Sequence, residues 1–69
     1  MISSMAYYIF TQPVRPPFDW ELLETIGHPE VAEETFRDYQ RIIGGRKAPK
    51  IALVEAESVR EGMISLRES

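Results

Sequence analysis

The first strong pattern along the chain is a run of aromatic and β-branched residues, Ala6–Gln12 (AYYIFTQ), which contains no glycine or proline. This composition is typical of a β-strand. Alternation along a strand places Tyr8 and Phe10 on one face and Tyr7 and Ile9 on the other, so both faces are apolar. The pattern therefore predicts a central strand, or a strand covered by a helix and by a second chain. A proline-rich segment follows and ends the strand.

Two helices are predicted in the middle of the chain. The longer one spans about Pro29–Ile43, because proline suits the first helical position and an apolar stripe follows it. The stripe recurs at the spacing of one helical face: Ala32, Phe36, Tyr39 and Ile43. A shorter helix, Trp20–Ile26, is predicted from Asp19 as its N-cap and from the glycine that comes directly after it.

The C-terminal part is open to two interpretations. Ile51–Glu57 and Met63–Arg67 both have the composition of short strands, whereas residues 52–61 also fit a helix. We prefer two strands, which gives the order β-α-α-β-β. This is an α+β fold in which a small antiparallel sheet carries two helices packed on one face. The alternative replaces the third strand by a helix.

The chain has 69 residues, of which 43% are hydrophobic and 28% charged, a globular balance. We expect one small domain, residues 1–69, with residues 1–5 as a flexible extension and either Met1 or Met5 as the native start. There is no cysteine and only one histidine, His28, so we expect no disulfide, metal or other cofactor. A membrane span and a signal peptide are not recognisable, which points to the cytoplasm.

The net charge of −3 hides a strong segregation. Residues 21–40 carry six acids and one arginine, net −5, whereas residues 41–50 carry four cations and no acid, net +4. The four cations flank a Gly-Gly pair and are candidate contacts to a phosphate or to an acidic protein surface: Arg41, Arg46, Lys47 and Lys50. The other interpretation is an ordinary helix end followed by a solvated basic loop.

These patterns favour a small non-enzymatic module that regulates or binds a larger protein partner and can form a homodimer. Tyr7, Tyr8 and Phe10 are candidates for self-association, since an aromatic strand suits the packing of two chains. No catalytic constellation is recognisable. The first alternative is a nucleic-acid-binding accessory or transcription regulator that uses the basic loop 41–50. The second is a small subunit of an enzyme complex, with His28 or Tyr8 as a donor at an interface.

Overall fold

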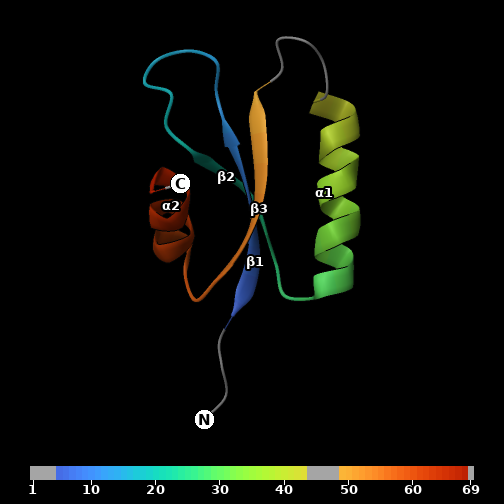
Figure 1. Cartoon of the computed structure of the whole chain (residues 1–69). Coiled ribbons are helices and arrows are strands. Elements are labelled where there is room, and N and C mark those ends of the chain that lie inside the picture. Colours follow the sequence, from blue (N-terminus) through green and yellow to red (C-terminus); the bar gives the residue numbers. More distant parts are fainter. Residues whose placement is uncertain (1–4, 44–48, 69) are drawn as a thin grey trace.

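The computed structural model describes residues 5–43 and 49–68, which form a three-stranded sheet and two helices (Figure 1). The elements follow in the order β1 (Ala6–Gln12), β2 (Glu21–Ile26), α1 (Pro29–Ile43), β3 (Lys50–Ala56) and α2 (Val59–Arg67). The predicted α+β class, a small antiparallel sheet with two helices, is confirmed. The predicted order of the elements is wrong, because the structure has β-β-α-β-α. Four of the five residues expected as a flexible extension, 1–4, lie outside the described residues.

The sheet has the order β2-β1-β3, so the aromatic strand β1 is central, as its sequence predicts. Both neighbours are antiparallel to β1. The β1–β3 ladder is regular from Ala6↔Ala56 to Gln12↔Lys50. The β1–β2 ladder contains a β-bulge, because Ile9 pairs with Glu24 and Phe10 with Leu22, which leaves Leu23 as an extra residue on β2.

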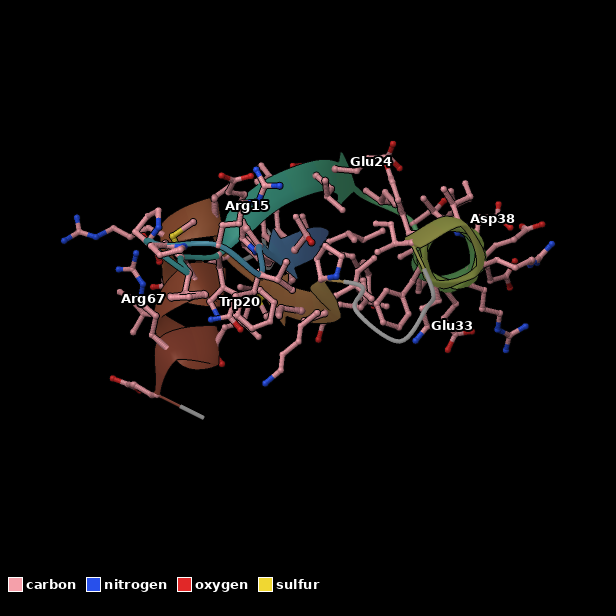
Figure 2. All side chains as sticks on the ribbon, turned by 90° about the horizontal axis from the view of Figure 1, so that it is seen from above. Arg15, Trp20, Glu24, Glu33, Asp38 and Arg67 are labelled. Carbon is pink, nitrogen blue, oxygen red and sulfur yellow. The ribbon has the colours of Figure 1, made fainter. Side chains whose placement is uncertain are left out.

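The two helices cover opposite faces of the sheet, and not one face as predicted (Figures 1 and 2). On one face, Tyr8 and Phe10 pack beneath α2. On the other, Ile9 packs with Ala32 and its neighbours on α1. Because the side chains of β1 are apolar on both faces, a helix layer on one face alone would leave half of them in water, so each face is covered by a helix.

Helix α1 has the predicted bounds, and its apolar stripe faces the sheet as expected. Ala32 is fully buried, and Phe36 and Tyr39 pack against the same cluster. His28 lies at the N-cap position, where its carbonyl oxygen accepts a hydrogen bond from the Ala32 N–H at 2.9 Å. Proline at the first helical position leaves no unpaired amide there.

The short helix predicted at Trp20–Ile26 is wrong, because this segment forms strand β2. A helix of seven residues is marginal in water, since few of its amides find partners within the segment. As a strand, the same segment forms a hydrogen-bonded ladder with the second edge of β1 and buries Ile26 beside Ile9. Pairing with β1 thus outweighs a local preference for helix.

In the C-terminal part, the predicted strand Ile51–Glu57 is confirmed as β3, whereas Met63–Arg67 is not a strand but belongs to helix α2. A helix does take the place of the third predicted strand, but it spans Val59–Arg67 and not residues 52–61, of which 52–56 belong to β3. Ser58 is the N-cap of α2, and its hydroxyl oxygen accepts a hydrogen bond from the Glu61 N–H at 3.2 Å.

Neither helix of the described residues combines the length and the apolar character needed to cross a membrane.

Candidate functional site

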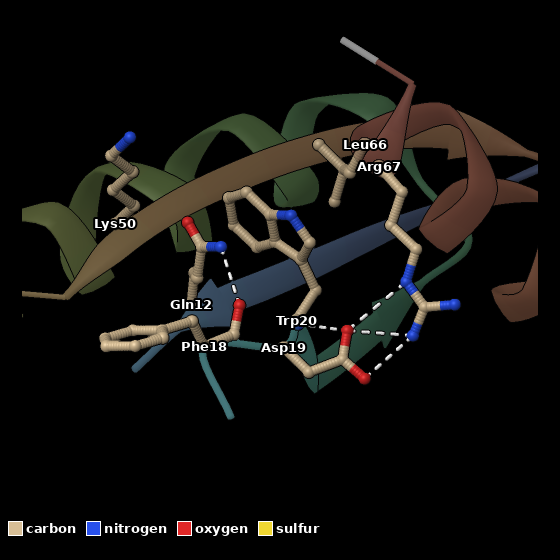
Figure 3. A pocket seen from close by; sticks show the side chains of 7 residues that line it. All are labelled: Gln12, Phe18, Asp19, Trp20, Lys50, Leu66 and Arg67. Carbon is tan, nitrogen blue, oxygen red and sulfur yellow. Dashed lines mark hydrogen bonds and ion pairs between the residues drawn. The ribbon is translucent and has the colours of Figure 1, made fainter. Parts of the chain in front are cut away.

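An open groove of about 450 Å³ lies at one end of the sheet, where the β1–β2 connection, the start of β3 and the end of α2 meet (Figure 3). Its volume is in the range of sites that hold small ligands or short peptide segments. Seven residues line this loop-end groove: Gln12, Phe18, Asp19, Trp20, Lys50, Leu66 and Arg67. A second hollow of about 410 Å³ shares Gln12, Phe18 and Lys50 with it and adds Pro13 and Val14. The two hollows therefore form one continuous surface around Phe18.

Phe18 has an unusual backbone, with φ of 58°, and the residue as a whole is 52% exposed. This left-handed conformation costs a non-glycine residue about 1–2 kcal/mol. Both backbone polar groups of Phe18 are held, because its N–H donates to the Arg15 carbonyl at 3.0 Å and its carbonyl accepts from the Gln12 side chain at 2.7 Å. The loop thus holds an aromatic ring in water at an energetic cost.

The opposite wall of the groove is fixed by an ion pair between Asp19 and Arg67, residues that are 48 positions apart in the sequence (Figure 3). The guanidinium donates to both carboxylate oxygens at 2.8 Å, a forked geometry that fixes orientation as well as distance. These hydrogen bonds lower the pKa of Asp19 against a smaller raising effect of desolvation; the Arg67 charge and the Trp20 N–H lower it further. The pair ties the last turn of α2 to the chain segment that leads into β2.

The floor and rim of the groove combine aromatic and cationic chemistry. Trp20 is half-buried and packs with Leu66 against the Tyr8–Phe10 cluster, so its indole is held in place. Lys50 is exposed at the rim and forms no ion pair with any described residue. Because Asp19 balances Arg67, Lys50 supplies the uncompensated charge among the described residues of the lining, whose net charge is +1.

Of the two predicted cations that the structure describes, Lys50 lines the groove and Arg41 does not. Arg41 lies at the end of α1, where it pairs with Asp38 at 3.4 Å on the exposed surface. Arg46 and Lys47 lie outside the described residues. Phe18, Trp20 and the Asp19–Arg67 pair were not among the predicted site residues. Two aromatic residues directly after a proline-rich segment were the available signal, because such a segment holds side chains at the surface.

Of the three residues predicted for self-association, two lie in the interior and Tyr7 is half-buried. Tyr8 and Phe10 are buried, and both edges of their strand are paired, so they offer no free surface for a second chain. Tyr7 is half-buried on the α1 face, opposite Glu55 on β3. The Glu55 carboxylate raises the pKa of Tyr7 by hydrogen bonding, with further raising effects from desolvation and from the charges of Glu55 and Glu33. The aromatic strand therefore builds the core of one chain.

The remaining candidates for chemistry are dispersed. His28 is exposed at the start of α1. Within residues 5–43 and 49–68, no group of three or more His, Asp or Glu side chains is placed to hold a metal ion. Comparison of the chain with protein-family models, with curated proteins and with solved structures found no match. The loop-end groove and the edges of the sheet are the features of the described residues that point to a function.

Proposed function

We propose that the chain is a small, non-enzymatic protein-interaction module that binds an extended segment of a larger protein in the loop-end groove. The observation that carries this proposal is Phe18, an exposed ring held by a strained backbone above a cavity. Strained residues persist where the surrounding structure determines them, and they cluster at binding sites. A rigid aromatic side chain beside a hollow is a common anchor of protein interfaces.

The lining indicates the chemistry of the partner segment. Phe18 and Trp20 offer apolar surface to one side chain of the partner, and Lys50 at the rim offers an ammonium group to a carboxylate. We therefore expect a segment in which an aromatic or aliphatic residue lies close to Asp or Glu. A nucleic acid is less well matched, because a chain of phosphates requires several uncompensated cations and the described lining supplies one.

The single tryptophan is a built-in reporter, since Trp20 lies in the groove. Its fluorescence would be followed during titration with a short peptide that carries Phe, Leu and Asp, with the same peptide in which Lys replaces Asp, and with a mixed-sequence single-stranded oligonucleotide. We expect saturable binding of the acidic peptide and much weaker binding of the basic one. Tight, strongly salt-dependent binding of the oligonucleotide would replace the proposal by the nucleic-acid alternative.

Two substitutions separate binding from folding. Asparagine tolerates the left-handed region, so Phe18→Asn should leave the free energy of unfolding equal or higher while removing the anchor ring. Lys50→Gln should weaken binding of the acidic peptide, and Arg60→Gln, an exposed cation on α2 that does not line the groove, is its matched control. Unchanged peptide affinity in both Phe18→Asn and Lys50→Gln would refute a role of the groove.

A further inference from the structure

The sheet ends in two edge strands, β2 and β3, and each pairs only with β1 among the described residues. An edge strand presents unpaired N–H and C=O groups to any extended chain, and natural proteins protect such edges with charges, prolines or bulges. Strand β2 has two of these protections. Its ladder is interrupted by the bulge at Leu23, and it carries Glu21 and Glu24, which are both exposed. Figure 2 shows Glu24 projecting to the outside of the molecule.

Strand β3 is protected less, because its two charged residues, Lys50 and Glu55, lie near the ends of the strand. Its ladder with β1 runs without a bulge through all seven residues, and it contains no proline. Four consecutive apolar residues, Ile51–Val54, stand between Lys50 and Glu55 and are only half-buried although helices pack near both faces. A regular edge with four consecutive uncharged apolar residues is the kind that pairs with another strand.

We propose that β3 pairs antiparallel with β3 of a second copy of this chain, which joins the two sheets into one of six strands. Full overlap of Lys50–Ala56 with its copy places Leu53 opposite itself on the two-fold axis. Paired residues then lie on the same face of the sheet, so each apolar face continues across the interface. The helix layers also continue, because α1 and α2 both contact β3.

Charge favours a second copy as the occupant of the β3 edge. In this register Lys50 lies opposite Ala56 of the copy, and Glu55 lies opposite Ile51 of the copy, so no like charges face each other. The seven residues carry one cation and one anion, so self-pairing is electrically neutral. Pairing of β2 with its own copy would bring four carboxylates together with no cation on either strand.

The test is the oligomeric state of the full chain, measured by light scattering and sedimentation at tens of micromolar, where weak dimers are populated. We expect twice the chain mass of 8.0 kDa. A matched pair of variants probes the register. Ile51→Glu places a carboxylate opposite Glu55 of the copy, whereas Ile51→Lys places an ammonium group there. Both remove the same half-buried side chain, so their cost to one chain is similar, and circular dichroism would verify that both fold.

We expect the dimer dissociation constant of Ile51→Glu to exceed that of Ile51→Lys about tenfold or more. The two symmetric pairs of residue 51 with Glu55 of the copy are repulsive in the first variant and attractive in the second. The chain has no cysteine, so Leu53→Cys gives a clean second test. It should form an intermolecular disulfide under mild oxidation faster than Ala52→Cys, since only residue 53 meets its own copy. A monomeric wild-type chain, equal dissociation constants for the two Ile51 variants, or equal cross-linking at both positions would overturn the proposal.

Discussion

The contact between Gly62 on α2 and Phe10 on β1 gives the sharpest test of the packing. Gly62 is buried, and a Cβ added there would lie 3.2 Å from Phe10 Cε2, 3.4 Å from Phe10 Cζ and 3.7 Å from the Ala56 Cβ. The first distance is shorter than an ordinary van der Waals contact, and the Phe10 ring is fully buried. The glycine therefore lets α2 approach the sheet closely, and Gly62→Ala would push the helix against the ring.

Two effects of Gly62→Ala oppose each other. Alanine favours the helix over glycine by about 1 kcal/mol. Overpacking a close contact costs about 1–3 kcal/mol. We expect a net loss of about 1 kcal/mol in the free energy of unfolding. Phe10→Leu removes the two ring atoms that the methyl group meets, so in that background Gly62→Ala should stabilise the fold by about 1 kcal/mol. The predicted coupling energy between the two sites is thus about 2 kcal/mol.

Urea unfolding followed by Trp20 fluorescence and by circular dichroism measures all four proteins of this cycle. Gly27→Ala is the control, because a Cβ at Gly27 meets nothing within 4 Å and its φ is not positive. It should be neutral or stabilising by up to about 1 kcal/mol. If the effects of Gly62→Ala and Phe10→Leu add to within about 0.5 kcal/mol, the steric argument is refuted.

Three further predictions concern titration and capping. The pKa of Asp19 is lowered in the fold, so its ion pair with Arg67 contributes stability above the usual Asp pKa; this contribution is lost as the pH falls through the lowered value. In Asp19→Asn, the free energy of unfolding, measured with urea at a series of acidic pH values, should fall less as the pH is lowered. The pKa of Tyr7 is raised, so its contribution is present below the usual Tyr pKa and is lost as the pH rises through the raised value. Glu55→Gln should lower the Tyr7 pKa followed by NMR of its ring, and an unchanged value would contradict the assigned cause. Ser58→Ala should cost about 1 kcal/mol of unfolding free energy and Ser58→Asp much less, whereas equal losses would contradict the cap.

Much of the fold could be predicted from periodicity and composition, namely those elements whose signals all lie within their own segment of the sequence. Helix α1 has the residues for its start, its stripe and its length in one segment, and its bounds are correct. The central position of β1 followed from apolar side chains on both of its faces. Strand β2 could not be predicted in the same way. Its leucines favour a helix locally. The segment forms a strand because it pairs with the free edge of β1, and its own sequence does not show that this partner exists.

The candidate site was less accessible to prediction, since it forms where distant segments meet. The sequence interpretation found Lys50 by charge alone, but the pairing of Asp19 with Arg67 depends on α2 returning to the start of β2. The strain at Phe18 lies in the backbone conformation of the loop, which the composition of the loop does not indicate. Side-chain identity therefore indicated which charges were available, and tertiary structure decided which of them remained uncompensated.

The direction of the two helices determines where the acidic and basic residues of the chain lie in the molecule. Both α1 and α2 begin at the same end of the molecule and run toward the loop end (Figure 1). Their first turns carry Glu30 and Glu61 and their last turns carry Arg41 and Arg67, so each helix dipole is complemented at both ends. Because the helices point the same way, these charges do not cancel across the molecule but separate along it. At the end where the groove opens, Asp38 pairs with Arg41 and Asp19 with Arg67, so Lys50, which has no ion pair with a described residue, is the charge that attracts the acidic partner proposed for the groove.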